Sequence, residues 1–327
     1  MRAPYIVAEV SCNHLGSLDR ALALIAAAAA AGADAVKFQC WADDKMVLGD
    51  YTIAGTVWAG QDMRALYAEA WTPWDWFPKL FFHARRVGIE CFASVFDHES
   101  LAFLEGLNCP RYKIASFEIV DLPLIEAVAK TGKPIVISTG MATWDEMVQA
   151  RAAARRGYEY VDVTLLKCTS AYPATAASAN LATIEVIGSA GVSDHTLGLA
   201  VPVAATALGA TMIEKHLTLS RSDGGPDAAF SSEPHEFKAM VDACREAALS
   251  IGEVRYGPTE SELPSLQFRR SLYWAEPLAP GSYVQRRHLR IARPALGAAP
   301  ADLSKFINRR TTREVAYGDP AQLSDVD

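Results

Sequence analysis

Short apolar segments rich in β-branched residues alternate along most of this chain with longer alanine- and leucine-rich segments of helical period. The expected strands are 4–10, 34–39, 89–94, 111–115, 134–138, 160–166, 191–195 and 211–216. This alternation is typical of repeated βα units rather than of a run of hairpins. Eight such units within one domain predict an α/β fold, a (β/α)8 TIM barrel.

Helix boundaries support this interpretation. Residues 121–131 begin with an aspartate and an early proline, and residues 143–155 open with a capping-box pattern from Thr143 to Glu146. The longest apolar run, residues 21–38, is interrupted by Gly32 and Asp34 and is rich in alanine, so we interpret it as helix, turn and strand rather than as a membrane span.

The alternation of expected strands and helices is interrupted in two places. Residues 40–76 interrupt the alternation with a long insertion that contains several tryptophans, and a loop of this length is more often functional than idle. Residues 253–268 carry three glutamates with proline and glycine, as expected of a linker. We therefore predict a catalytic barrel over 1–252, a linker over 253–268 and a small β-rich domain over 269–327.

Composition narrows the classes of function. Of the 327 residues 50% are hydrophobic, enough for a sizeable core, and the six cysteines are far apart without a CxxC motif, which argues against a disulfide framework. The formal net charge is −7 and the basic residues form no long run, so neither nucleic acid nor a membrane surface is an expected partner. The chain enters its first strand without a leader segment, from which we expect a cytoplasmic location.

Ligands of a barrel bind at the carboxyl ends of its strands, and polar residues end nearly every expected strand. These are Glu9, Lys37, Gln39, Ser94, Lys113, Ser116, Ser138, Thr139, Lys167, Thr169, Ser193, His195, Glu214 and His216. Two lysines at the mouth of an acidic protein indicate an anion such as phosphate or carboxylate. Alternatively, each lysine is ion-paired, the serines cap helices, or a lysine is the nucleophile of a Schiff-base aldolase.

The stretch IEKHLTL (213–219) is unusual because it places three ionisable residues in an apparently buried strand. Alternate residues of a strand share a face, so Glu214 and His216 point one way and Lys215 the other. His195 ends the neighbouring strand, and the two histidines together could bind one divalent metal, although either could be a hydrogen-bonded core residue. Lys215 is left without an explanation.

Several motifs, in order along the chain, resemble those of the sialic acid (nonulosonic acid) synthases. They are IVAEVSCNHLGS (6–17), AGADAVKFQ (31–39), YKIASFE (112–118), TGKPIVISTGMAT (131–143), KCTSAYP (167–173), VSDHTLG (192–198), IEKHLTL (213–219), GGPDAAFSSEPHEF (224–237) and RRSLYWA through IARP (269–294). The resemblance implies a barrel followed by a C-terminal antifreeze-like (SAF) domain. It also implies condensation of phosphoenolpyruvate with the open-chain aldehyde of an acetamido sugar.

The resemblance also implies roles for individual residues. His195 and His216 would bind the metal, Mn²⁺ or a like ion such as Mg²⁺ or Co²⁺, and Glu9 would orient sugar and water. Tyr172 and Asp227 would contact the sugar. The groups expected to hold the phosphate and carboxylate, or to line the site beside them, are Lys37, Gln39, Ser94, Lys113, Ser116, Ser170, Ser193 and Glu214.

Arg293, in IARP, matches a family arginine that reaches from the antifreeze-like domain into the partner subunit's site. This match implies a domain-swapped homodimer, since a two-fold axis completes both sites at once; from the residues alone, a surface ion pair is the simpler interpretation. Three departures concern details of substrate contact: Ala295 replaces a glycine of the following turn, Ser94 stands where threonine is common, and Ser170 stands where some members have asparagine.

The tryptophan-containing insertion resembles the pseudaminic acid synthase branch most. A 2,4-diacetamido-2,4,6-trideoxyhexose is less polar than N-acetylmannosamine, which suits an aromatic loop over the site. Trp58, Trp71, Trp74 and Trp76 could equally pack the loop onto the barrel. N-acetylneuraminate or legionaminic acid synthesis and a non-catalytic sugar-binding relative remain as alternatives.

Overall fold

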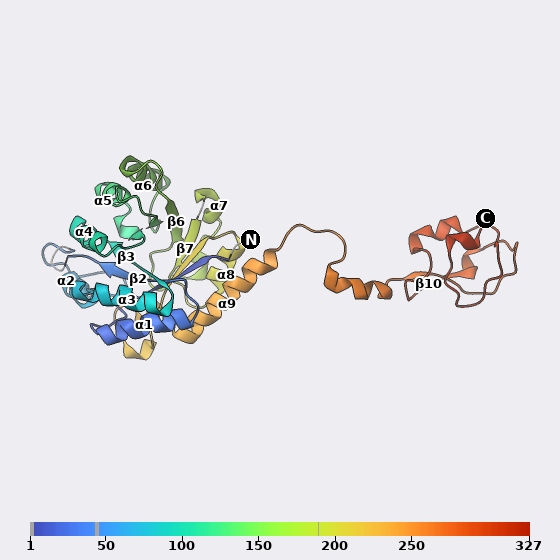
Figure 1. Ribbon diagram of the computed structural model, residues 1–327, viewed down its shortest axis with the longest axis horizontal. Coiled ribbons are helices and arrows are strands. Elements are labelled where there is room, and N and C mark those ends of the chain that lie inside the picture. Colours follow the sequence, from blue (N-terminus) through green and yellow to red (C-terminus); the bar gives the residue numbers. More distant parts are fainter. Residues whose placement is uncertain (1–2, 43–45, 189) are drawn as a thin grey trace. The chain divides into compact units, whose positions relative to one another are not determined.

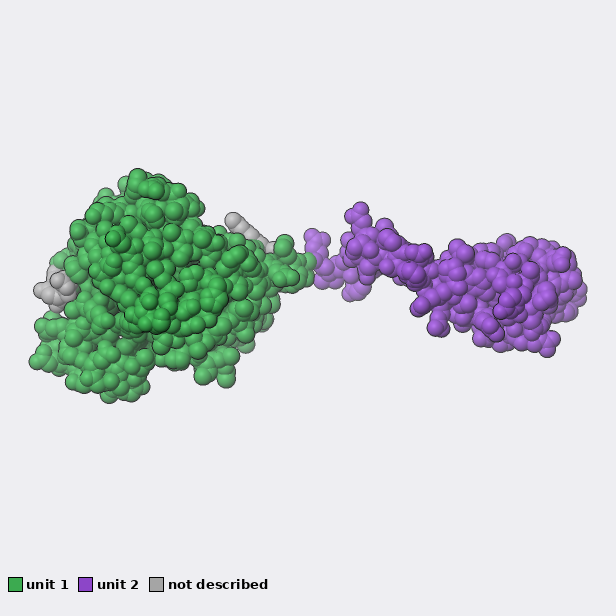
Figure 2. All heavy atoms as spheres, turned by 90° about the horizontal axis from the view of Figure 1, so that it is seen from below, with its two compact units in different colours: residues 1–252 green, residues 253–327 purple. Residues whose placement is uncertain are grey.

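The computed structural model describes residues 3–42, 46–188 and 190–327. The chain divides into two compact units, Met1–Gly252 and Glu253–Asp327 (Figure 2).

Eight parallel strands of the first unit close into a barrel in chain order, because the last strand pairs with the first (Figure 1). They are β1 (Tyr5–Glu9), β2 (Ala35–Cys40), β3 (Glu90–Val95), β4 (Tyr112–Ile114), β5 (Ile135–Ser138), β6 (Val163–Cys168), β7 (Ala190–Asp194) and β8 (Met212–His216). The expected (β/α)8 barrel is confirmed.

Helices follow the strands and surround the barrel (Figure 1). They are α1 (Leu18–Ala30), α2 (Met63–Ala70), α3 (Phe77–Val87), α4 (His98–Gly106), α5 (Leu122–Ala129), α6 (Trp144–Gly157), α7 (Thr183–Ile187), α8 (Ala200–Ala207) and α9 (Pro234–Ile251). Both expected caps form: Asp121 accepts from Leu124 N at 3.0 Å, and Thr143 with Glu146 makes a reciprocal capping box.

Seven strands begin and end within one residue of their expected bounds, and β6 is the exception. It starts at Val163 rather than at residue 160, because residues 158–162 form a turn, and it continues to Cys168. The shift brings Cys168 to the carboxyl end of the barrel, beside Ser193 of β7.

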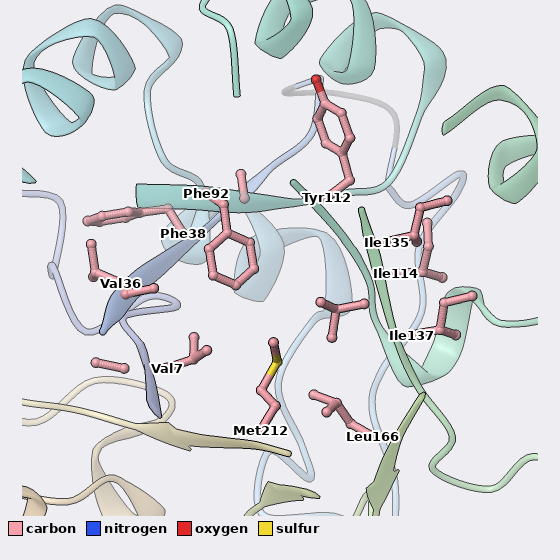
Figure 3. Packing of buried hydrophobic residues seen from close by; sticks show 14 of the residues in the cluster. Val7, Val36, Phe38, Phe92, Tyr112, Ile114, Ile135, Ile137, Leu166 and Met212 are labelled. Carbon is pink, nitrogen blue, oxygen red and sulfur yellow. The ribbon is translucent and has the colours of Figure 1, made fainter. Parts of the chain in front are cut away.

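The barrel interior is apolar in the middle of the strands and polar toward their carboxyl ends. Val7, Phe92, Leu166 and Met212 point toward one another inside the ring of strands (Figure 3). Two residues further along each strand, on the same face, come Glu9, Ser94, Cys168 and Glu214. The apolar layer thus supports a polar layer at the end where barrels carry their sites.

The insertion after β2 contains α2 and a short 3₁₀ turn, Trp74–Trp76. The indole nitrogens of Trp71 and Trp74 donate to Trp41 O at 3.2 and 2.9 Å, and Trp74 stacks on Phe103 with ring centroids 4.5 Å apart. The two indole bonds fold the insertion back onto its own start, and the stack on Phe103 of α4 attaches it to the barrel unit, as the packing interpretation expects.

The second unit has a core of its own, formed by Leu272, Trp274, Val284, Leu289, Phe306, Val315 and Ala321. Its strands β9 (Ser271–Trp274) and β10 (Leu289–Ala292) form an antiparallel pair, and a 3₁₀ segment, Glu260–Phe268, precedes them. The indole of Trp274 donates to Asp325 Oδ2 at 3.1 Å, which ties the C-terminal segment to this small β domain. Across the described ranges of both units, no helix has the length and apolarity needed to span a membrane.

Candidate active site

Two lysines and two glutamates form a buried network at the carboxyl ends of β1, β2, β4 and β8. Lys37 Nζ lies 2.6 Å from Glu9 Oε2 and 3.8 Å from Glu214 Oε2, and Lys113 Nζ lies 3.1 Å from Glu214 Oε1. None of the four residues is more than 3% exposed. Each ammonium therefore has a carboxylate beside it, as burial of charge requires.

Within this network the pKa values shift in both directions, and at Glu9 burial prevails over the charge of Lys37 and raises the pKa. Burial alone would raise the pKa of Glu214, but the ammonium groups of Lys113 and Lys37 outweigh it and hold this pKa at about 2. Burial lowers the pKa of Lys37, yet the charges of Glu214 and Glu9 reverse the effect and raise it. For Lys113 burial prevails over the attraction of Glu214, and its pKa is lowered.

Hydroxyl and amide groups surround this network. Ser94 Oγ accepts from Lys37 Nζ at 3.0 Å, Ser193 Oγ donates to Glu214 Oε1 at 3.0 Å, and Gln39 Nε2 donates to Glu9 Oε1 at 2.9 Å. These partners come from β2, β3 and β7, so the network spans most of the barrel mouth.

Ser116 and Ser170 meet at the ends of β4 and β6, with Gly140 between them. Ser116 Oγ accepts from Gly140 N at 3.2 Å. A Cβ atom on Gly140 would collide with both hydroxyls, so only glycine allows the two serines to approach this closely. Two hydroxyls suit recognition of an anionic oxygen.

His195 and His216 lie side by side, as the sequence predicts. Their ring centroids are 5.3 Å apart, and the residues are 6% and 8% exposed. His195 Nδ1 lies 3.0 Å from Thr169 O, which leaves Nε2 as the nitrogen for a ligand. Burial, with His195 and neighbouring ammonium groups adding to it, lowers the pKa of His216 well below its usual value, so this ring is neutral at pH 7.

The histidine pair fits a metal. His216 Nδ1 is buried and has no hydrogen-bond partner among the described residues, and Asp227 Oδ2 lies 3.5 Å from it. The described residues contain no group of three or more His, Cys, Asp or Glu side chains arranged to hold a metal, so the protein's donors for a divalent cation would be the two imidazoles, with positions left for other ligands.

A cavity of about 380 Å³ opens above this floor. Gln39, Ser116, His216 and Asp227 line it from the barrel side. Residues of the insertion line it from the other side: Ile53, Thr56, Trp58, Met63, Leu66, Tyr67 and Ala70. The insertion is therefore a largely apolar roof over a polar floor.

Trp58 behaves differently from the tryptophans that attach the insertion. Its indole nitrogen donates to Pro226 O at 3.0 Å, which connects the roof to the loop after β8. Its ring lies 5.1 Å from that of Tyr172, and the Tyr172 ring lies 4.5 Å from that of His195. Phe230, 5.0 Å from Tyr172 and 5.1 Å from His216, completes an aromatic wall beside the histidines.

Arg293 is the one residue of the sequence-predicted set that belongs to the second unit. It is exposed and lies just after β10. The barrel unit brings together the other thirteen, in contact with one another or with the cavity.

Two neighbours of the site did not emerge from the sequence. Glu118 follows Ser116 in the YKIASFE motif; burial raises its pKa to about 7, and its Oε2 has no hydrogen-bond partner in the described part of the chain. Cys168 Sγ lies 3.8 Å from His195 Nδ1. Glu118 could have been found from its position two residues beyond a strand-end serine, whereas Cys168 was hidden by the misplaced end of β6.

Fold and geometry together define a class: a (β/α)8 barrel with a charged, hydroxyl-rich site and a histidine pair at the carboxyl ends of its strands. The NeuB family model matches residues 24–256, and the chain belongs to the NeuB family.

Individual relatives agree with this membership. The chain is 39% identical to the pseudaminic acid synthase of Helicobacter pylori, over 100% of this chain and 99% of the relative. It is 33% identical to the N,N'-diacetyllegionaminic acid synthase of Legionella pneumophila, over 96% and 92%. A crystal structure of N-acetylneuraminic acid (sialic acid) synthetase from Leptospira borgpetersenii, in complex with citrate, covers 82% of this chain and 92% of its own, with 31% identity and a TM-score of 0.72.

Proposed function

We propose that this protein is a pseudaminic acid synthase. It would condense phosphoenolpyruvate with a 2,4-diacetamido-2,4,6-trideoxyhexose and water to give pseudaminic acid and inorganic phosphate. The observation that carries the proposal is that the buried lysines and serines and the histidine pair occur at the same end of one barrel, in a chain that matches a pseudaminic acid synthase along its whole length.

The anionic substrate would bind at the polar layer. Lys37 and Lys113 supply the charge, and Ser94, Ser116, Ser170 and Ser193 supply hydrogen bonds to phosphate and carboxylate oxygens. Because both ammonium groups already face Glu9 and Glu214, they are held in place before the substrate arrives, which lowers the ordering cost of binding.

His195 and His216 would hold a divalent metal, Mn²⁺ or alternatively Mg²⁺ or Co²⁺. When bound there, the metal supplies Lewis-acid polarisation of the sugar aldehyde. The protein holds the two reactants in line, so that C3 of phosphoenolpyruvate attacks the aldehyde carbon and water adds at C2. Cleavage of the C–O bond then releases phosphate and leaves the 2-keto group.

The remaining residues would orient the sugar and water. Glu9 is held by Lys37 and Gln39 and would position the sugar and the attacking water. Tyr172 and Asp227 line the cavity and would contact the sugar, and Glu118, with its raised pKa, is added to them as a carboxyl that can exchange a proton near pH 7.

The apolar roof favours the trideoxy sugar. A 6-deoxy carbon and two acetamido methyl groups present apolar surface that Ile53, Met63 and Leu66 can cover, whereas a hydroxylated chain would lose hydrogen bonds to water there.

A panel of acetamido sugars, assayed for phosphate release with and without a chelator, tests the proposal. Turnover of the trideoxy sugar that is lost with the chelator and restored by Mn²⁺ is the expected result. Turnover of N-acetylmannosamine or of the legionaminic acid precursor alone would instead establish a neuraminate or legionaminic acid synthase.

Two alternatives of other classes have their own outcomes. The lowered pKa of Lys113 is a property of lysines that form Schiff bases, and borohydride trapping of substrate with full activity in chelator would establish an aldolase. Binding of sugar with no turnover of any sugar would establish a non-catalytic relative.

The second unit would be an antifreeze-like domain that contributes Arg293 to the N-acetyl group of a sugar bound in the partner subunit. The assembly would then be a domain-swapped homodimer. We propose a cytoplasmic location, where phosphoenolpyruvate is produced.

A further inference from the structure

Lys215, between Glu214 and His216, lies on the outer face of the barrel wall. It is 1% exposed, and its Nζ lies 2.6 Å from Asp194 Oδ2. Asp194 pairs with Lys215 in the register of β7 and β8, and it too points away from the cavity. The pair is therefore separated from the substrate cavity by the strands themselves.

The side chains of Lys215 and Asp194 both bind Thr196, the residue that follows His195. Lys215 Nζ donates to Thr196 O. Asp194 Oδ1 accepts from Thr196 N at 3.0 Å, and Asp194 Oδ2 accepts from Thr196 Oγ1 at 3.1 Å. The carbonyl, amide and hydroxyl of one residue are thus all bound to a single buried ion pair.

The turn after β7 also contacts the loop that contains Tyr172. His195 O accepts from Ala174 N at 3.0 Å, and Thr196 forms a parallel bridge with Ala174. A shift of Thr196 would move His195 directly and Tyr172 through Ala174.

A buried ion pair is weak evidence for stability, because desolvation offsets its attraction and apolar residues can often replace it without loss. Its value here is geometric, because an apolar pair could fill the space but could not hold the Thr196 carbonyl, amide and hydroxyl. We propose that Asp194 and Lys215 are positioning residues that set the place of the His195 ring opposite His216 and of Tyr172 beside it. This inference rests on the proposed role of His195 as a metal ligand.

The test is the double substitution Asp194→Asn/Lys215→Met, which removes both charges and leaves neither buried alone. Mn²⁺ binding is measured by electron paramagnetic resonance titration, and phosphoenolpyruvate affinity by calorimetry. We expect the Mn²⁺ Kd to rise about 10- to 100-fold, as for other residues that orient metal ligands, while the affinity for phosphoenolpyruvate changes less than about threefold.

The control is Glu90→Gln/Arg111→Met, a pair whose side chains are 27% and 21% exposed, against 2% and 1% for Asp194 and Lys215. Glu90 and Arg111 also form an ion pair between neighbouring strands, with Arg111 Nε 2.5 Å from Glu90 Oε1, but at the amino ends of β3 and β4. Its loss should lower the thermal midpoint without changing the Mn²⁺ Kd. If the Asp194/Lys215 variant behaves in the same way, the pair is merely structural and the inference is wrong.

A crystal structure of the double variant separates this inference from the proposed function. If wild-type protein binds no Mn²⁺, the metal assignment fails, yet displacement of the His195 ring in the variant still supports the positioning role, and an unmoved ring overturns it. Should the double variant not fold, Asp194→Asn alone enters the same titration and crystal structure and is judged by the same two outcomes.

Discussion

Lys113 Nζ lies 3.1 Å from Glu214 Oε1 at the mouth of the barrel, and both residues are almost completely buried. The same oxygen accepts a hydrogen bond from Ser193. One carboxylate from β8 therefore holds an ammonium from β4 and a hydroxyl from β7 in fixed positions. A ligand anion must approach an ammonium group whose charge is already partly balanced.

This pairing predicts opposite effects on ligand binding from its two partners. Lys113→Met should abolish measurable phosphoenolpyruvate binding, because it removes a cation and leaves Glu214 as an uncompensated charge. Glu214→Gln should leave phosphoenolpyruvate affinity equal or higher, because the ammonium loses its competing carboxylate, although turnover falls.

Stability measurements provide the control for this pair. Each single variant should lose roughly 3–5 kcal/mol of unfolding free energy, as expected when a buried pair is broken, whereas Lys113→Met/Glu214→Gln should lose less than either. Urea denaturation measures the three values. Equal losses that simply add in the double variant would show that the two residues do not interact in the folded protein.

Glu118 predicts a pH dependence of stability. Burial raises the pKa of its carboxyl from 4.5 to about 7, so the folded protein holds a proton that the unfolded chain releases. Stability from this group is therefore full below pH 4.5 and falls as the pH rises toward 7. Glu118→Gln cannot ionise, and above pH 7 we expect it to be more stable than wild type by up to about 3 kcal/mol.

Thermal midpoints of both proteins from pH 4.5 to 8.5 check this expectation. The two curves should converge at the acidic end and separate at the basic end. A constant difference across the range would place the carboxyl in contact with water rather than in the buried position described above.

Trp58 predicts a change in sugar preference. Trp58→Ala removes apolar surface from the roof and its bond to Pro226, so kcat/KM for the trideoxy sugar should fall about 10- to 100-fold, within the range of discrimination that apolar pockets achieve. Trp58→Phe keeps much of the ring contact and should lie between this variant and wild type. The KM for phosphoenolpyruvate, which we propose to bind at the lysines, should be unchanged in both variants. An equal rise in the KM of both substrates would show that the site as a whole had collapsed.

Much of this site could be predicted from residue spacing because strands alternate with a period of two and parallel strands end at the same edge. That rule places Lys37 beside Glu9, and His195 beside His216, without any knowledge of packing. It also places Lys215 on the opposite face, but it cannot say what a buried ammonium does there. The answer depends on Asp194, the last residue of β7, and on its hydrogen bonds to Thr196 in the turn that follows, which the strand period does not predict.

The roof was harder to predict for a different reason. The sequence does not distinguish Trp58 from Trp74 and Trp76 of the same insertion, yet Trp74 and Trp76 pack against Phe103 and His14 of the barrel unit while Trp58 lines the cavity. Which tryptophan faces the cavity depends on where α2 begins, after Asp62. It also depends on the hydrogen bond from the Trp58 indole to Pro226 O, which is distant in sequence. No periodic pattern carries that information.

Arg293 leads to a prediction about assembly. If it completes the site of the partner subunit, His216→Ala and Arg293→Ala damage different subunits' contributions to one site. Each variant alone has two defective sites, so at low sugar concentration both homodimers should be nearly inactive. In a mixed dimer, the barrel of the Arg293→Ala subunit retains His216 and receives Arg293 from the other subunit, which gives one intact site of two.

Co-expression of the two variants in equal amounts should give mixed dimers as half of the population, and therefore about one quarter of wild-type activity. Activity no greater than the sum of the two separate variants would mean that Arg293 acts within its own subunit or not at all. Analytical ultracentrifugation of the wild-type protein is the control, because complementation requires a dimer. A dimer that fails to complement would rule out a contribution of Arg293 to the partner subunit's site.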